Sequence, residues 1–280
     1  MAAIKEYLCE DKYQGQIIIG GQMIDTHSHI YDEAYKADFE QVVERARRAG
    51  VEKIVMPGID SSCHADMVSC ADALPGFAFA AIGLHPTEVN ENWRQELQFV
   101  YDHYADRQWV AIGEIGMDLY WSKDYLQQQK EVFCAQLTLA YEKDLPVIIH
   151  AREATEEIFE CIRRVAKPLR GVFHAFTGSY ETYRRIKSAG DFYVGIGGVV
   201  TFKNAHVATA LERIPLEDIL LETDAPYLTP VPYRGRRNES AYVRYVADKI
   251  AAIKGVDFDT VEKITTDSAE KLFRFLKNIP

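Results

Sequence analysis

Two histidines separated by one residue, His27 and His29, close a short apolar run near the start of the chain. On a β-strand, residues i and i+2 point to the same face, so both imidazoles would project together with Asp25 aligned behind them. Neutral imidazole is the commonest metal ligand near pH 7, and two of them side by side could clamp one ion. A chance surface pair would have the same spacing, so this motif alone does not decide between the two interpretations.

The other candidate ligands also stand where short apolar runs end. They are His85, Glu114, His150, His174 and Asp224. Five of the eight histidines of the chain therefore follow or close such a run. One polar residue at the end of a buried strand is expected by chance, whereas the repeated choice of histidine and carboxylate is not. In barrel enzymes the active-site groups come from the C-terminal ends of the strands, so the set predicts a metal site at one barrel mouth.

The elements that must position these residues alternate regularly from residue 23 onward. Short apolar runs lie near residues 24–29, 53–58, 78–85, 110–115, 146–150, 171–176, 192–197 and 219–223. Amphipathic segments separate them, for example 38–50, which opens with a capping Asp38 and closes with a stop glycine, and 125–142. Strands that alternate with helices indicate right-handed βαβ units and a parallel sheet.

Eight such units within roughly 250 residues predict a closed (β/α)8 TIM barrel that forms a single domain. An open doubly wound sheet is the main alternative, because it could use fewer of these runs. Two further helical stretches are expected at about 239–254 and 260–275. Residues 1–22 precede the pattern; they could form a short strand and turn or serve as a leader, and no function is assigned to them. Residues 23–280 are expected to form the barrel.

The composition is that of a globular protein, with 48% apolar and 26% charged residues. No apolar run approaches the roughly 20 residues of a membrane span, and no secretion signal is evident, so no membrane partner is expected. Five scattered cysteines without CxxC spacing are typical of reduced thiols in a cytoplasmic protein. The net charge of −10 argues against a broad grip on duplex DNA, but it allows a nucleic acid to be held at one small metal-rich cleft.

From Met23 to the C-terminus the motifs resemble the TatD family of metal-dependent deoxyribonucleases, within the amidohydrolase-like barrel superfamily. The matching segments, in the family's order, are 24–29 (IDTHSH), 83–86 (GLHP), 113–118 (GEIGMD), 149–152 (IHAR), 173–178 (FHAFTG) and 222–226 (ETDAP). Three departures are visible. Residues 1–22 precede the usual start, Ala175 and Thr177 stand where the family often has Cys and Ser, and Ser240 stands where Pro often follows Asn-Glu. None of these positions is a candidate ligand.

The resemblance implies a site with two divalent ions, either Mg²⁺, Mn²⁺ or Zn²⁺. His27, His29 and Asp224 would hold one ion, His150 and His174 would hold the second, and Glu114 would bridge the two. Related barrel hydrolases often use a carboxylated lysine as the bridge, and the fourth run has no lysine, which favours the nuclease branch. Two divalent ions balanced by two carboxylates would suit one hydroxide and one phosphodiester anion in an in-line displacement. Asp224 could also orient the attacking water or accept its proton.

Three residues are candidates for substrate contacts. His85 would stand at the rim and donate a hydrogen bond to a phosphate oxygen, with a structural histidine as the alternative. Arg152 could bind phosphate or serve as a salt-bridge partner. The loop 233–237 is locally basic and suits a phosphate backbone, with a solvated charged loop as the alternative; within it the resemblance favours Arg234.

Three more residues are expected near the site without being ligands. Glu222 is expected to support a ligand or an arginine. Asp118 and Trp121 lie beyond Glu114 in a loop that could border the cleft. An exposed Trp there could stack on a base, whereas packing within the loop is the alternative.

Three functions fit this set of residues. The first is a metal-dependent phosphodiesterase that digests DNA from an end or along a single strand, which is the activity that the resemblance implies. The second is a metal-dependent hydrolase of a small ester, lactone or amide on the same barrel. The third is a non-catalytic metal- or nucleotide-binding protein, and the complete ligand set argues against it. A small cleft on an acidic protein favours a threaded strand over a wrapped duplex.

Overall fold

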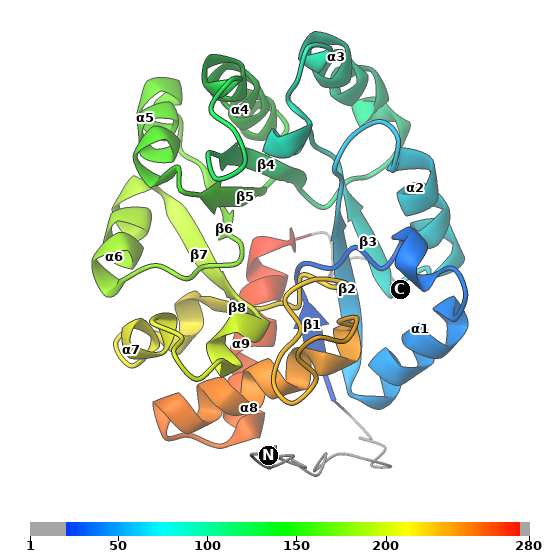
Figure 1. Cartoon of the computed structure of the whole chain (residues 1–280), viewed down its shortest axis with the longest axis vertical. Coiled ribbons are helices and arrows are strands. Elements are labelled where there is room, and N and C mark those ends of the chain that lie inside the picture. Colours follow the sequence, from blue (N-terminus) through cyan, green and yellow to red (C-terminus); the bar gives the residue numbers. More distant parts are fainter. Residues whose placement is uncertain (1–20, 275–280) are drawn as a thin grey trace, which may run out of the picture.

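Parallel strands form the centre of the protein, and helices surround them (Figure 1). A computed structural model describes residues 21–274 of the chain. Its strands are β1 (Met23–Asp25), β2 (Val51–Pro57), β3 (Ala78–Ala81), β4 (Ile112–Asp118), β5 (Val147–Arg152), β6 (Arg170–Phe173), β7 (Asp191–Ile196) and β8 (Ile219–Leu221). Each predicted apolar run overlaps one of these strands, with boundaries that differ by up to a few residues.

The strands close into a ring. Strands β1 to β3 pair in order, and strands β4 to β8 pair in order. An isolated parallel bridge between Ile82 and Ile112 joins the two groups, and a second bridge between Ser28 and Ala225 joins the last strand to the first. The predicted (β/α)8 barrel in a single domain is therefore confirmed, and the open doubly wound sheet is excluded.

Helices α1 to α7 each follow one strand and lie on the outside of the ring, and α8 and α9 follow the last strand (Figure 1). They are α1 (Phe39–Arg48), α2 (His64–Ala73), α3 (Trp93–His103), α4 (Leu126–Glu142), α5 (Thr155–Val165), α6 (Tyr180–Ala189), α7 (Val207–Leu211), α8 (Val243–Lys254) and α9 (Phe258–Leu272). The segments predicted at 38–50 and 125–142 correspond to α1 and α4, and the two C-terminal stretches correspond to α8 and α9.

The start of α1 differs in one detail from the prediction. Asp38 occupies the N-cap position, but its carboxylate makes no capping hydrogen bond. It accepts hydrogen bonds from the guanidinium groups of Arg237 and Arg45 instead. The expected cap is wrong because two charged donors compete for the carboxylate more strongly than a backbone N–H does.

A hydrophobic cluster fills the inside of the barrel. It consists of residues such as Ile24, Val55, Ile148 and Val172, together with side chains of α9 and its end, including Leu272 and Phe273. Helix α9 packs against β1 and β8 and lies across the end of the barrel where the strands begin (Figure 1). The core therefore closes this end, and the polar residues at the ends of the strands face the opposite mouth.

The predictions about a membrane span and about the N-terminal segment have different outcomes. No helix within residues 21–274 is long and apolar enough to cross a membrane. Residues 1–20 lie outside the described residues, so the separate treatment of residues 1–22 stays a prediction. The cytoplasmic location also stays a prediction.

Candidate metal centre

The carboxylate of Glu114 lies at the centre of a buried cluster of imidazoles. Its Oε1 is 2.8 Å from Nδ1 of His150, 2.8 Å from Nε2 of His174 and 3.3 Å from Nε2 of His85. Its Oε2 is 3.0 Å from Nε2 of His27. Residues that are far apart in the sequence therefore meet in one pocket at the C-terminal mouth of the barrel.

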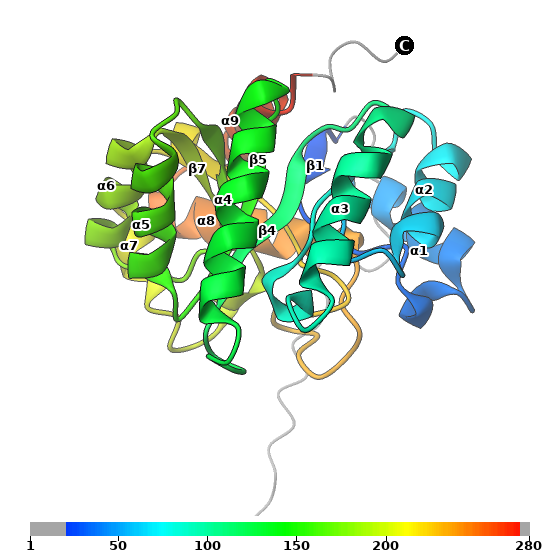
Figure 2. The same ribbon diagram turned by 90° about the horizontal axis from the view of Figure 1, so that it is seen from above.

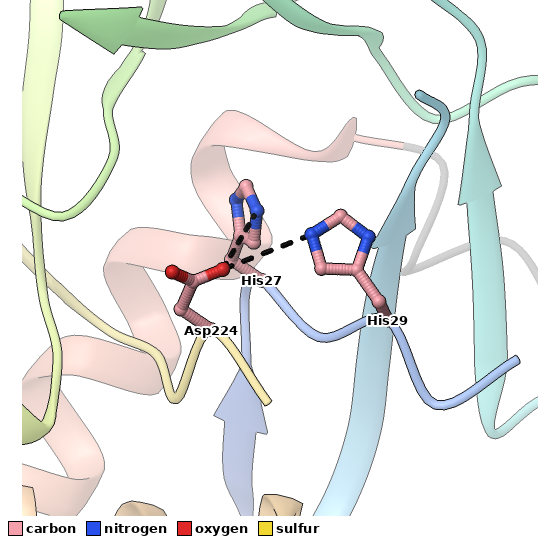
Figure 3. A group of neighbouring side chains, drawn as sticks. All are labelled: His27, His29 and Asp224. Carbon is pink, nitrogen blue, oxygen red and sulfur yellow. Dashed lines mark ion pairs between the residues drawn. The ribbon is translucent and has the colours of Figure 1, made fainter. Parts of the chain in front are cut away.

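Asp224 completes a second group with the two histidines that follow β1 (Figure 3). Its Oδ1 lies 3.6 Å from Nε2 of His27 and 3.7 Å from Nε2 of His29. The centres of the two imidazole rings are 5.1 Å apart. The prediction that both histidines belong to the strand is wrong, because β1 ends at Asp25 and they lie in the segment that follows it. Asp224 has a φ of 57°, a left-handed conformation that Asp tolerates better than most residues do and that occurs at functional sites.

The close approach of β4 and β5 brings Glu114 and His150 together. Gly116 pairs with His150 in the parallel ladder, and a Cβ atom at position 116 would lie 2.0 Å from the His150 carbonyl oxygen. Only glycine fits there, both because of this contact and because its φ is 142°. The ladder continues to Asp118, which pairs with Arg152. Asp118 therefore belongs to the strand, and its predicted place in a loop is wrong.

Strand β4 places Asp118 on the same face as Glu114, four residues earlier, because side chains alternate with a period of two. Its Oδ2 lies 2.9 Å from Nε2 of His150, so this carboxylate holds the ring nitrogen that faces away from Glu114. Glu222 lies behind His174 in a similar way, with Oε1 3.5 Å from Nδ1. Carboxylates behind ligating histidines orient the rings and raise their basicity. The sequence alone indicated this role for Glu222 but missed it for Asp118.

Tyr31 holds His29 from behind, and sequence reasoning missed this residue. The phenol donates a hydrogen bond to the carbonyl oxygen of Pro57 at 2.6 Å, so its oxygen is left to accept one from Nδ1–H of His29 at 2.9 Å. This contact places the lone pair of the neutral ring on Nε2, the atom that faces Asp224. The signal available in the sequence was the position of Tyr31, which lies two residues after His29, just as His29 lies two residues after His27.

Replacing Tyr31 with Phe should weaken divalent-ion binding about 10- to 100-fold, because Nδ1–H of His29 loses its acceptor and the ring loses its fixed orientation. The measurement is isothermal titration of the purified variant with Mn²⁺. Tyr183→Phe is a matched control, since Tyr183 is a buried tyrosine whose phenol donates to Asp218. Unchanged affinity in Tyr31→Phe, or equal losses in both variants, would count against an orienting role for Tyr31.

His85 lies deeper than the predicted rim, with its side chain 13% exposed. Its Nδ1 accepts a hydrogen bond from the backbone N–H of Thr87 at 3.2 Å. A neutral ring then carries its proton on Nε2, the atom that faces the pocket. This tautomer suits donation to an oxygen, such as Oε1 of Glu114, which lies 3.3 Å from Nε2.

Burial and proximity shift the pKa values of the pocket in opposite directions. Burial, assisted by the charge of His174, lowers the pKa of His27 well below its ordinary value. Burial alone would raise the pKa of Glu114, but the neighbouring histidines, led by His174, hold it well below its usual range. Burial raises the pKa of Asp224 to about 7. Asp224 is therefore a largely buried carboxyl group, with its side chain 15% exposed, whose charge the surrounding protein compensates poorly, as expected where a cation binds.

The donor atoms fit divalent ions. Three overlapping groups have one ligand atom per residue within 4.8 Å of one another, namely His27–His29–Asp224, His27–Glu114–His174 and His85–Glu114–His150. Among the described residues, neither ring nitrogen of His27 makes a hydrogen bond of acceptable geometry, although the side chain is fully buried and Nε2 lies 3.0 Å from Oε2 of Glu114. Such an imidazole suits a ligand of an ion, and two ligands of one ion with bonds of about 2.0–2.2 Å lie about 3–3.5 Å apart.

The two arginines proposed as substrate contacts are exposed at the mouth. The guanidinium of Arg152 lies 3.8 Å from the centre of the Tyr120 ring, and that of Arg234 lies 4.1 Å from the centre of the Phe202 ring. Within residues 21–274 no ion pair is formed by either arginine, in contrast to Arg237, which binds Asp38. The salt-bridge alternative for Arg152 is therefore not observed, and the phosphate contacts stay predictions.

A (β/α)8 barrel with histidines and carboxylates gathered at its C-terminal mouth is the architecture of a barrel metallohydrolase. The family model described as TatD related DNase matches residues 24–274. The chain belongs to the TatD family of metal-dependent hydrolases.

Known relatives agree with this assignment over most of their length. The chain is 41% identical over 254 residues to the uncharacterized metal-dependent hydrolase YabD of Bacillus subtilis, covering 90% of this chain and 99% of that protein. It is 33% identical over 262 residues to the 3'-5' ssDNA/RNA exonuclease TatD of Edwardsiella piscicida, covering 90% and 99%. The crystal structure of YjjV, a TatD homolog from Escherichia coli, superimposes with a TM-score of 0.81 at 28% identity, covering 90% of this chain and 98% of that one.

Proposed function

We propose that this hydrolase is a deoxyribonuclease that cleaves phosphodiester bonds at DNA ends or along a single strand, as an exonuclease. The observation that carries the proposal is the Glu114 carboxylate, whose two oxygens face different imidazoles. Oε2 approaches His27, whereas Oε1 approaches His150 and His174. A carboxylate in this position can serve two adjacent cations, and paired cations are typical of enzymes that cleave phosphate esters. The name of the Edwardsiella relative, an exonuclease on single strands, supports the same substrate class.

The proposed ligand set divides around Glu114. His27, His29 and Asp224 would hold one ion, and His150 and His174 would hold a second, with Glu114 shared. Mg²⁺, Mn²⁺ and Zn²⁺ are the candidate ions. When bound, such ions lower the pKa of water and stabilise negative charge on phosphate oxygens.

The remaining roles belong to the side chains of this protein. Asp224 presents its carboxylate to the pocket, where it can accept a proton from the attacking water. His85 carries a proton on Nε2 and can donate it in a hydrogen bond to a phosphate oxygen. Arg152 and Arg234 are exposed at the mouth, where they can bind the phosphates of a strand. They provide local positive charge on a chain whose net charge is −10.

A chelator-controlled digestion tests the proposal. An end-labelled single-stranded oligodeoxynucleotide should be shortened stepwise when Mg²⁺ or Mn²⁺ is supplied, and it should stay intact with excess EDTA. Parallel reactions with blunt duplex DNA, RNA, and a set of simple esters, lactones and amides determine the substrate class. Absence of any nucleotide product with all three candidate ions would reject the nuclease proposal. Metal-dependent turnover of the small compounds alone would favour the second hypothesis.

A further inference from the structure

Exposed apolar side chains gather beside the metal centre. Within residues 21–274, eight large hydrophobic side chains are exposed, and five of them lie in the loops that follow β4 and β8: Tyr120, Trp121, Tyr227, Leu228 and Val231. Both loops project from the same end of the barrel (Figure 2). The most exposed of the eight is Trp121, at 71%. Exposed aromatic groups concentrated at one site mark a binding surface rather than ordinary surface composition.

The loop that carries Trp121 is tied directly to the proposed metal ligands. Asp118 uses Oδ2 to hold Nε2 of His150, and its Oδ1 accepts hydrogen bonds from the backbone N–H groups of Tyr120 at 3.0 Å and Trp121 at 3.4 Å. A single buried carboxylate therefore fixes both a metal-site imidazole and the aromatic pair. The backbone of the pair is thereby anchored one residue away, through Asp118, from a proposed metal ligand.

The aromatic pair is arranged so that one ring face stays available. Arg152 covers Tyr120, with its guanidinium 3.8 Å from the ring centre, and the rings of Tyr120 and Trp121 meet edge to face at 4.9 Å. Tyr120 is thus held between two neighbours, whereas Trp121 presents its indole to solvent. The Arg152 guanidinium lies 5.5 Å from the Trp121 ring centre. A flat apolar ring beside a cation complements a nucleotide, whose base is flat and whose phosphate is an anion.

We propose that Trp121 is a stacking platform for one unpaired nucleobase of the substrate strand, with Arg152 beside it to bind the adjoining phosphate. The inference rests on the proposed nuclease function and adds a substrate feature to it: the enzyme requires a base that is free of a complementary strand near the cleaved bond. Stacking on an indole is available to every base, so the platform provides single-strand selectivity without sequence selectivity.

Kinetics with a modified strand tests the platform. Trp121→Ala should raise KM for a single-stranded oligodeoxynucleotide about tenfold, with a smaller change in kcat, because stacking contributes to ground state and transition state alike. Trp121→Phe should recover most of this loss, since it keeps an aromatic face. An oligonucleotide with abasic residues at its terminal positions should bind the wild-type enzyme weakly and should show no further loss with Trp121→Ala. Tyr141→Ala is the matched control, because Tyr141 is 42% exposed near the far end of α4.

Fluorescence provides a readout that does not need catalysis. The chain has three tryptophans, and Trp93 and Trp109 are buried at 9% and 2% exposure, so an added strand can reach only Trp121 by stacking. Titration with oligothymidylate in EDTA should quench the emission of the wild-type protein and of Tyr141→Ala, but not that of Trp121→Phe.

The outcomes separate this inference from the nuclease proposal. Equal KM values for wild type and Trp121→Ala, or equal losses on normal and abasic strands, would overturn the platform while leaving the nuclease intact. Quenching without cleavage under any ion would overturn the nuclease and support the platform. If neither quenching nor cleavage is observed, both proposals are overturned.

Discussion

Glu114→Ala should abolish metal-dependent turnover, with a loss of at least about 10³-fold, equivalent to about 4 kcal/mol of transition-state stabilisation. Glu114 belongs to two of the three ligand groups, and its carboxylate lies between His27 on one side and His150 and His174 on the other. The measurement is the initial rate of single-strand digestion at saturating Mn²⁺. Bound metal, measured by mass spectrometry after dialysis, should fall in parallel.

Glu114→Gln is the control for shape, because it keeps the volume of the side chain and removes its charge. It should be nearly as inactive as Glu114→Ala if the negative charge is what matters. Both variants should keep the far-ultraviolet circular dichroism of the wild type, since the hydrophobic clusters of the barrel do not include Glu114. Metal-dependent activity that survives in a folded Glu114→Ala protein would remove the bridging role.

Asp224→Asn should lower kcat about 10²- to 10⁴-fold, because the amide can neither accept a proton from water nor supply the negative charge that faces His27 and His29. Asparagine is a clean replacement at this position. It tolerates the left-handed conformation of residue 224, whose φ is 57°, so the backbone should not move. Steady-state kinetics on the same labelled strand provides the measurement.

Asp144→Asn is the matched control for this substitution. Asp144 has a φ of 51°, and its side chain is 73% exposed at the opposite end of β5 from the site. The same chemical change in the same backbone conformation should leave kcat unchanged. Wild-type turnover in Asp224→Asn would show that another group accepts the proton and that the charge of Asp224 is dispensable.

The architecture and the ligand positions were predictable because both depend on local patterns. Apolar runs separated by amphipathic segments specify strands and helices wherever they occur, and closing eight βα units brings all strand ends to one mouth. His27 and His29 could be paired from their spacing, although β1 ends at Asp25, before both of them. Glu114 was predicted at the end of the fourth run, whereas β4 continues beyond it to Asp118. Their meeting within 3.0 to 4.0 Å follows from the barrel, whichever helices connect the strands.

Contacts between side chains were less predictable, as three residues illustrate. Asp38 was expected to cap α1, yet it binds Arg237, 199 residues later in the chain. Asp118 was placed in a loop, because the ladder between β4 and β5 that extends the strand is not visible in either strand by itself. The orienting contact of Tyr31 depends on a carbonyl group of β2.

The sequence by itself determined the barrel, the family and the residues that gather at its mouth, since periodicity and strand-end chemistry are properties of short segments. Tertiary structure alone decided which ring nitrogen of each histidine faces the pocket and how Asp118 links His150 to the exposed Trp121. It also decided that Arg152 and Arg234 form no ion pair within residues 21–274. The physical reason is that hydrogen bonds and ring contacts act over about 3–6 Å with strict orientation. Such contacts between distant segments therefore depend on the register of the strands that carry them.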